Sequence, residues 1–378
     1  MVPNLRFSYK GDWSKRKLNE ICQFFKGNSL SKSDLSNEGF PCILYGELYT
    51  TYKNEVIRDI ISKTNTTLSN PFLSRNNDLI IPGSGEDPID IAVARAIYQN
   101  DIILGGDLNI LRPKSNVSAA FLSYQLNGVR RYDIAKKAQG KSIVHLHNSD
   151  LKEVLVSIPT YDEQLHIAKL LTKIDEMIET QSKIIDSYFS LSKAISNTLI
   201  GQSKGNTRLR ECLNCYSSNT MESVIKQEDL GDYPVYGANG IIKKINNYEI
   251  EYPSIAIVKD GSGVGKMFKL SGKYSILSTL NYLTSKPGYD IDYIYYALKQ
   301  KSLKKYVVGS GIPHIYFKDY EQEKIYIPQN ELQQQNITSV LQSIDEEIGN
   351  EIKQLKNYEL LKKYLLKNMG NPQLDRVD

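Results

Sequence analysis

Residues 158–178 read IPTYDEQLHIAKLLTKIDEMI, and residues 327–348 return to the same pattern as IPQNELQQQNITSVLQSIDEEI. The Asp-Glu pair that begins at Asp175 reappears at Asp345, and 345 − 175 gives an offset of 170 positions. Self-similarity over a fixed period indicates an architecture built from repeated structural units. The chain is therefore predicted to contain two copies of one unit.

Each copy opens a heptad pattern, in which apolar residues alternate in steps of four and three. The apolar positions are Ile167, Leu171, Ile174, Ile178, Ile185, Tyr188, Ile195 and Leu199 in the first copy, and Ile337, Leu341, Ile344, Ile348, Leu355, Tyr358, Leu365 and Met369 in the second. The polar interruptions repeat as well, at Gln181 and Ser192 and again at Glu351 and Lys362. Such a stripe also fits the core face of an ordinary amphipathic helix, but more than four heptads favour a coiled coil. Two helices of roughly 35 to 38 residues, each beginning after an Ile-Pro, are predicted to pack antiparallel.

Outside these helices the pattern changes to short apolar runs rich in Ile, Val and Tyr, such as 78–81, 254–258 and 324–327. Such runs, bounded by turn residues, predict strands, and helices are expected at 119–126 and 291–298. The predicted fold class is α+β, with two mixed, mainly β heads that alternate with two long antiparallel coiled-coil helices in a pseudo-two-fold internal repeat. The predicted boundaries are 1–157 for the first head, 158–202 for the first helical region, 203–326 for the second head, 327–371 for the second helical region and 372–378 for a C-terminal tail.

Composition limits the possible functions only loosely. The formal net charge is +4, from 47 basic and 43 acidic side chains, which permits a nucleic-acid partner without requiring one. No apolar run is long enough to cross a bilayer, so a cytoplasmic protein is expected. The four cysteines are predicted to be reduced thiols. Cys212 and Cys215 form one C-x-x-C, but no second pair of ligands follows that could complete a structural zinc site.

The order of heads and helices, together with the repeated string, resembles the specificity subunit of type I restriction-modification enzymes. The string is carried in the first copy by Ile158-Pro159, Glu163-Gln164, Ile167 and Ile174-Asp175. The second copy departs from it, because Gln333-Gln334 stands where Glu-Gln is expected. The opening residues Val2 to Phe7 and Trp13 also look like those of the family.

This resemblance implies two target-recognition domains that bind a split double-stranded DNA target, one half-site per head. It also implies two modification subunits that methylate adenine with S-adenosylmethionine, and restriction subunits that depend on ATP. No cofactor is expected in this chain, since S-adenosylmethionine, ATP and Mg²⁺ would be held by the partner subunits. A helix of about 36 residues rises about 54 Å, so the half-sites are expected to be separated by several unread base pairs. The base sequence itself does not follow from one chain.

A DNA-reading head needs cations for phosphates and loops that approach base edges. Both heads place basic residues ahead of a Gly/Ser loop and also contain Tyr-Gly and Ser-Gly turns. These features also fit solvated helix ends and ordinary hairpin turns. The candidate DNA-binding residues are Tyr45, Ser84, Gly85, Arg130, Arg131, Lys136, Lys137, Lys141 and Ser142 in the first head, and Tyr236, Asn239, Ser262, Gly263, Lys266, Lys301, Lys304, Lys305 and Ser310 in the second.

Three sequence patterns resemble catalytic motifs, and each lacks a required part. Residues 261–266 lack the first glycine and the final Ser or Thr of a phosphate-binding loop, Asn70-Pro71-Phe72 lacks the second proline of a methyltransferase loop, and Glu351-Ile352-Lys353 lies in the heptad helix. The chain is therefore predicted to be a non-catalytic subunit. The alternatives are a nuclease or methyltransferase with its own active site, which would turn over without added subunits, and a structural scaffold, which would show no salt-dependent DNA binding.

Overall fold

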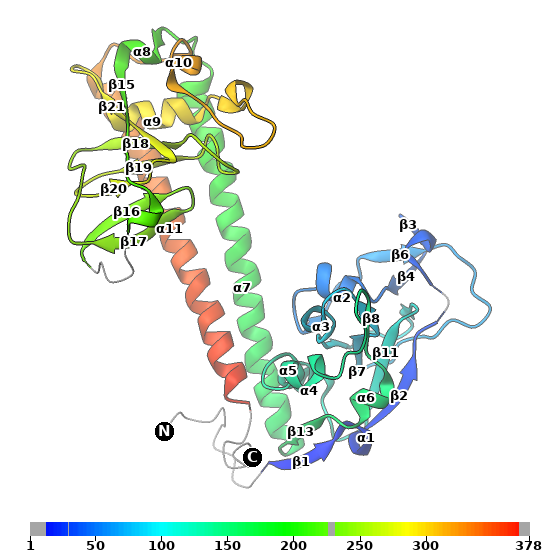
Figure 1. The fold of residues 1–378 in the computed structure, drawn as a ribbon. Helices are drawn as coiled ribbons and strands as arrows, with labels where there is room; N and C mark the ends of the chain where they lie inside the picture. Colours follow the sequence, from blue (N-terminus) through cyan, green and yellow to red (C-terminus); the bar gives the residue numbers. More distant parts are fainter. Residues whose placement is uncertain (1–12, 29, 226–230, 370–378) are drawn as a thin grey trace. The chain divides into compact units, whose positions relative to one another are not determined.

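A computed structural model describes residues 13–28, 30–225 and 231–369 of the chain (Figure 1). It separates into two compact units, residues 1–183 with 353–378 and residues 184–352. Each unit holds one head and one part of each long helix, and we call residues 13–158 the first head and 207–327 the second head. The predicted opening motif at Val2 to Phe7 and the predicted tail at 372–378 lie outside the described residues.

The first head contains a five-stranded sheet in the order β2-β11-β7-β9-β5 and a four-stranded sheet in the order β10-β4-β6-β3, with two further strand pairs, β1-β13 and β8-β12. The strands are β1 (Ser14–Lys17), β2 (Cys22–Lys26), β3 (Leu35–Ser36), β4 (Phe40–Ile43), β5 (Val56–Ile57), β6 (Ser62–Thr64), β7 (Asp78–Pro82), β8 (Ser84–Gly85), β9 (Arg95–Ile97), β10 (Ile103–Leu104), β11 (Leu108–Pro113), β12 (Val144–His145) and β13 (Leu155–Ile158). The helices are α1 (Leu18–Ile21), η1 (Lys32–Asp34), α2 (Glu47–Thr50), α3 (Pro88–Ile91), α4 (Ala119–Asn127), α5 (Arg131–Ala135) and α6 (Asn148–Lys152).

The second head contains a four-stranded sheet in the order β15-β21-β18-β19, a three-stranded sheet in the order β17-β16-β20, and the pair β14-β22. The strands are β14 (Thr207–Arg208), β15 (Leu213–Ser217), β16 (Tyr233–Gly237), β17 (Gly240–Ile245), β18 (Ser254–Val258), β19 (Met267–Leu270), β20 (Ser275–Ile276), β21 (Leu280–Ser285) and β22 (Lys324–Ile325). The helices are α8 (Leu209–Cys212), η3 (Glu222–Val224), α9 (Ile291–Lys299), η4 (Leu303–Tyr306) and α10 (Phe317–Tyr320).

The two heads share one strand topology, which confirms the predicted internal repeat. β11 pairs antiparallel with β2 and β7, just as β21 pairs antiparallel with β15 and β18. In the other sheet, β4 pairs parallel with β10, just as β16 pairs parallel with β20. The sequence similarity between the halves therefore reflects equivalent strands, and mixed parallel and antiparallel pairing agrees with the predicted fold class.

The helices α4 and α9 occupy the two predicted positions, 119–126 and 291–298, and each extends one residue further. Each begins at a side chain that satisfies an amide of the first turn. The Ser118 hydroxyl accepts a hydrogen bond from the Phe121 amide, and the Asp290 carboxylate accepts one from the Asp292 amide. Every residue of α4 from Ala119 to Leu126 is buried, so this helix lies in the core of the first head.

The long helices are α7 (Tyr161–Ser196) and α11 (Glu331–Lys367), with 36 and 37 residues, as the heptad pattern predicts. A one-turn π-helix, η2 (Asn197–Gly201), follows α7. In the first unit Lys362 contacts Asp175, and Leu171 lies in one core cluster with Leu365. Earlier residues of α7 thus meet later residues of α11, so the segments within this unit run antiparallel.

The glutamine that follows each Ile-Pro has the same structural role in both copies, although it stands five residues after Pro159 and six residues after Pro328. The Gln164 side-chain amide donates to the Pro159 carbonyl at 3.0 Å, and Gln334 donates in the same way to the Pro328 carbonyl at 2.8 Å. Each glutamine is buried and closes the turn that leads from the last strand of a head into a long helix. The repeated string therefore marks the joint between head and helix.

Candidate nucleic-acid interface

Three loops of the first head lie against one another. They follow β4 (residues 44–47), β7 (residues 83–87) and α5 (residues 136–146). The second and third are joined by the β8-β12 pair and by a hydrogen bond from the Leu146 amide to the Gly83 carbonyl at 2.9 Å. A Cβ added to Gly85 would lie 3.6 Å from the Tyr49 hydroxyl on α2, directly after the first loop. The structure thus gathers loops that are up to about one hundred residues apart in sequence.

The second head brings together the equivalent loops, at residues 236–240, 259–266 and 308–315. The Gly261 amide donates to the Pro313 carbonyl and the Ile315 amide to the Lys259 carbonyl, both at 2.9 Å. The Lys266 ammonium donates to the Asn239 side-chain oxygen at 3.2 Å and so links the first two loops. The Asn239 side-chain NH2 and the remaining N–H groups of the Lys266 ammonium stay available as donors.

The third loop has the same closed form in both heads. Two backbone hydrogen bonds join Gln139 to His145, at 2.9 and 2.7 Å, and two join Val308 to His314, at 2.9 and 2.8 Å. Gly140 and Gly309 adopt φ values of +137° and +94°, a region that L side chains rarely enter. A side chain there would also collide with the carbonyl oxygen three residues on, so both loops require glycine at this position.

Several predicted residues are exposed on or beside these loops. Lys136, Lys141 and Ser142 are exposed in the first head, and Asn239, Ser262, Lys266, Lys304 and Ser310 in the second. Within the ranges that the structure describes, Lys136, Lys141 and Lys304 take part in no ion pair or side-chain hydrogen bond. Lys137 and Lys301 are half-buried. Three cations are therefore available to phosphates without first breaking an internal pair.

Other predicted residues have a structural role, which corrects part of the expected site. Ser84 and Gly85 are not a loop tip, because they lie buried in β8, where the Ser84 hydroxyl donates to Asp107 at 3.0 Å. Gly263 is buried as well. These residues are buried because the third loop of each head closes over the Ser-Gly turn. Such a contact between distant segments leaves no local sequence signal.

The remaining candidates are already engaged within their heads. The Arg131 guanidinium donates to the Ile89 carbonyl at 3.0 Å, and the Arg130 side chain, 13% exposed, lies 3.5 Å from Asp133. Lys305 forms an ion pair with Glu323 at 2.7 Å. Tyr45 and Tyr236 are half-buried, and burial raises the pKa of Tyr236 above its ordinary value.

Two kinds of residue near the loops were not predicted. The Lys26 ammonium lies close to Gly83, where burial lowers its pKa and the nearby Asp107 carboxylate opposes that shift. Ile143 and Ile312 stand on the third loops with 57% and 72% of their surface exposed. A sequence signal existed for the isoleucines, because each follows the essential glycine by three residues, in GKSI at 140–143 and GSGI at 309–312.

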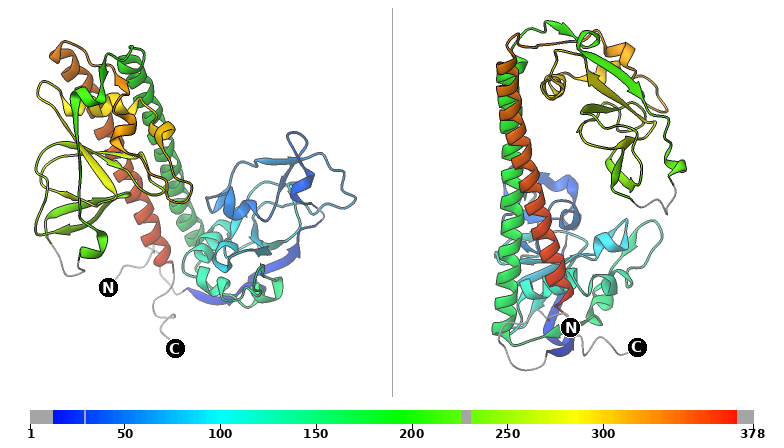
Figure 2. Two further views of the ribbon diagram at one scale, coloured as in Figure 1. Left: turned by 45° about the horizontal axis from the view of Figure 1, so that its top comes forward. Right: turned by 90° about the vertical axis from the view of Figure 1, so that its left-hand side faces the viewer.

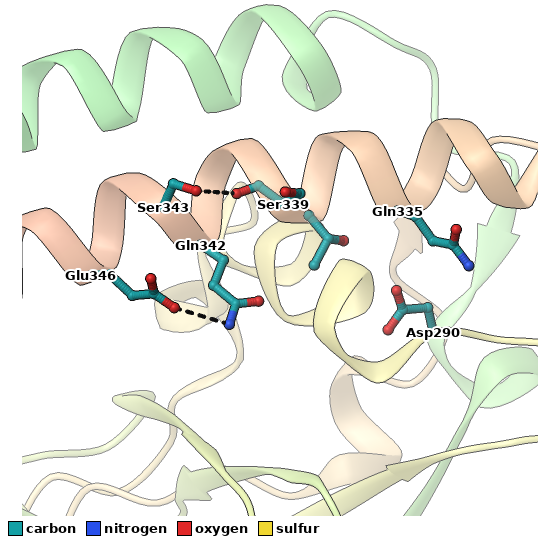
Figure 3. A pocket seen from close by; sticks show the side chains of 7 residues that line it. Asp290, Gln335, Ser339, Gln342, Ser343 and Glu346 are labelled. Atoms are coloured by element: carbon teal, nitrogen blue, oxygen red, sulfur yellow. Dashed lines mark hydrogen bonds between the residues drawn. The ribbon is translucent and has the colours of Figure 1, made fainter.

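Two hollows lie on the surface of the described residues. One of about 730 Å³ adjoins the first loop of the first head, beside Tyr45, Glu47 and Asp107. Another, of about 360 Å³, lies between the start of α9 and α11 in the second unit, lined by Asp290, Glu346 and neutral polar side chains (Figure 3).

The structure also shows why residues 261–266 are not a phosphate-binding loop. Residues 261–266 lead from β18 into the strand β19, whereas a phosphate-binding loop leads into a helix. Over residues 13–28, 30–225 and 231–369, no three His, Cys, Asp or Glu side chains are grouped to hold a metal ion. Burial raises the pKa of the Cys212 thiol to about 12, which suits an unreactive core cysteine. In the same ranges, no helix is long and apolar enough to span a bilayer.

Comparison with known proteins places this architecture. A specificity subunit of the type I restriction enzyme MjaVIII from Methanocaldococcus jannaschii is 34% identical over 41% of this chain and 39% of its own length. A putative type I specificity subunit from Mycoplasma genitalium is 23% identical over 100% of this chain and 98% of its own length. The crystal structure of a type I restriction-modification S subunit from M. genitalium superimposes with a TM-score of 0.70 at 19% identity, over 98% of this chain and 99% of that one, and so shares its fold.

The family model described as the type I restriction modification DNA specificity domain matches residues 10–187 and 207–357. Its two matches cover one head and most of one long helix each, and they leave out only the short connection between the halves and the ends of the chain. Members of this family are specificity subunits, which carry no catalytic centre. The chain therefore belongs to the family of type I restriction-modification DNA specificity subunits.

Proposed function

We propose that the chain reads a bipartite double-stranded DNA target, one half-site per head, in the cytosol. It would recruit two modification subunits and the ATP-dependent restriction subunits, which carry S-adenosylmethionine, ATP and Mg²⁺. The observation that carries the proposal is the recurrence of one three-loop cluster in both heads, each with exposed lysines and a rigid glycine-containing loop. Two equivalent clusters suit two half-sites, because each can approach one groove with its own cations and polar tips.

The division of labour among the loops follows from their chemistry. Lys136, Lys141 and Lys304 carry exposed charges and would neutralise phosphates, which positions DNA without reading its sequence. Asn239, Ser262 and Ser310 are exposed polar groups that would reach base edges. Ser84, Gly85 and Gly263 would support the loops from beneath.

Selection of bound duplexes from a random DNA pool by the full-length chain tests the bipartite reading. Two short fixed blocks separated by a spacer of constant length are expected. A single contiguous block would contradict one half-site per head, and the absence of salt-dependent binding would favour the scaffold alternative.

The phosphate contacts are tested by neighbouring lysines of the second head. Lys304→Gln should reduce the slope of log affinity against log salt by about one unit, and Lys136→Gln should do the same in the first head. Lys305→Gln is the matched control, because its ammonium is already paired with Glu323. Equal effects at 304 and 305 would contradict the assignment.

A further inference from the structure

An isoleucine stands exposed at the same place in both heads. Ile143 is 57% exposed and Ile312 is 72% exposed, each three residues after the glycine that closes its loop. A single exposed isoleucine is unremarkable on a protein surface. Its recurrence on two loops whose other exposed residues differ, Lys141-Ser142 against Ser310-Gly311, calls for a shared cause.

The backbone at these positions is held while the side chain is left in solvent. Each loop is closed by its pair of backbone hydrogen bonds, and the isoleucine carbonyl packs against the left-handed glycine. The packing fixes the isoleucine backbone but makes no use of its side chain. A branched apolar group on a rigid loop costs little conformational entropy when it is inserted into a partner, because few bonds remain to be ordered.

The surroundings of the tips point to nucleic acid. A protein partner would be expected to meet a contiguous apolar patch, whereas most of the other exposed side chains on these loops are polar, among them Lys141, Ser142 and Ser310, and Val308, 51% exposed, is an apolar exception. DNA offers a match, because its phosphates attract the cations while its base pairs offer apolar surface at thymine methyl groups and at the faces of base steps.

We propose that Ile143 and Ile312 make the apolar contact of each head with the base pairs of its half-site. This inference rests on the proposed function and deepens it, since it names the side chains that contact the bases. The contact is either with a thymine methyl group or with a base step that the isoleucine partly unstacks.

The experiment uses duplexes that the wild-type full-length chain selects from a random pool. Ile143→Ala and Ile312→Ala should each weaken binding to them about tenfold, with little change for a random-sequence duplex. Ile143→Val should retain most of the affinity. Ile61→Ala and Leu332→Ala are the controls, because both side chains are highly exposed, at 62% and 61%, and lie outside the three-loop clusters.

Two modified duplexes distinguish the sources of the contact. Uracil in place of thymine should weaken the wild-type chain but not the alanine variant if the methyl group is contacted. A rise in 2-aminopurine fluorescence that is lost in the variant would identify an unstacked step. If the wild-type chain selects no duplex, the proposed function fails. If it selects duplexes that the alanine variants bind equally well, the proposed function stands and this inference is overturned.

Discussion

The joint between head and long helix is built twice in this molecule, and the two copies differ in charge. In the first unit the Tyr124 hydroxyl on α4 donates to Asp175 on α7 at 2.7 Å, and in the second Tyr296 on α9 donates to Asp345 on α11 at 3.0 Å. Only the first adds a cation, as Lys362 lies 2.6 Å from Asp175 and 2.6 Å from Glu55. Among the described residues of the second unit, no ion pair reaches Asp345.

The difference shows which part of the joint is essential and which is an addition. The tyrosine–aspartate bond recurs and explains why the Ile-Asp step is repeated in the sequence. Lys362 occupies a gap in the heptad pattern where the other copy has Ser192. A lysine in a seam is tolerated there because it pairs with two buried carboxylates, Glu55 at 5% and Asp175 at 4% exposed. The first joint thus combines a shared bond with three buried charges that depend on one another.

Removing the Lys362 ammonium should cause the largest loss in the free energy of unfolding. Lys362→Met leaves Glu55 and Asp175 buried side by side, and breaking such a buried network costs about 3–5 kcal/mol. Urea denaturation followed by circular dichroism measures the loss. Lys363→Met is the control, because the neighbouring side chain is exposed. A loss below about 1 kcal/mol, as for an exposed pair, would show that the carboxylates do not need Lys362.

A pH dependence should separate the first joint from the second. Burial, with the nearby Glu55 charge, raises the pKa of Asp175 from 3.8 to about 6, although Lys362 opposes the shift. Because the folded pKa exceeds the ordinary value, the folded state binds more protons, and stability falls as pH rises from about 4 to about 6. The difference in free energy of unfolding between wild type and Asp175→Asn should therefore change by on the order of 2 kcal/mol over that range.

The control for this pH effect is the equivalent variant Asp345→Asn. This variant removes the equivalent carboxylate of the second joint, which is only half-buried. Denaturation at several pH values checks both. Parallel curves for wild type and Asp175→Asn would contradict the raised pKa. Lys362 does not titrate in this window. Burial lowers its pKa, but the Glu55 and Asp175 carboxylates raise it by more, so that the pKa lies above the ordinary value of 10.5.

Removing each tyrosine hydroxyl measures the bond that both joints share. Tyr124→Phe should cost about 1–2 kcal/mol, because it leaves a buried carboxylate with one partner fewer. Tyr296→Phe should cost less, about 0.5–1 kcal/mol, because water can replace the hydroxyl at Asp345. Denaturation of the two variants side by side gives the comparison. A larger loss at Tyr296 would show that burial does not set the strength of the bond.

The sequence predicted the parts of the fold that rest on local periodicity. The heptad seam located α7 and α11 to within a few residues, because a stripe repeated over many turns has one helical solution. The buried runs at β7 and β18 and the helices α4 and α9 were found for the same reason. The repeat itself located equivalent loops in both heads.

The parts that escaped prediction depend on contacts between distant segments. Glu55 and Lys362 are 307 positions apart, and no local pattern pairs them. The burial of Ser84 in the first head follows from closure of the third loop over it. In the second head, Lys305 precedes the third loop and forms an ion pair with Glu323, which follows that loop in the sequence. Sequence composition pointed to equivalent loops in both heads, which stay a prediction as a DNA-binding site, but it could not tell their exposed residues from the buried ones.

A smaller difference between the copies lies on the helix surface. In the first unit Glu176 pairs with Arg58 and with Lys173 three residues before it. The equivalent Glu346 accepts a hydrogen bond from Gln342 at 3.3 Å, and Ser343 takes the place of Lys173 (Figure 3). The two positions are 170 residues apart and lie in the long helices α7 and α11, drawn green and red in Figure 2.

Ser343→Lys transplants this pair and tests whether the two helices are equivalent at the level of single turns. A lysine three residues before Glu346 should form the exposed pair that Lys173 forms with Glu176, and such pairs stabilise a helix by about 0.2–0.5 kcal/mol. The gain should disappear in high salt, because exposed charges are screened. Ser343→Gln, with similar length and no charge, is the control. A gain that persists in 1 M salt, or that the glutamine variant matches, would assign the effect to helix propensity instead of the repeated ion pair.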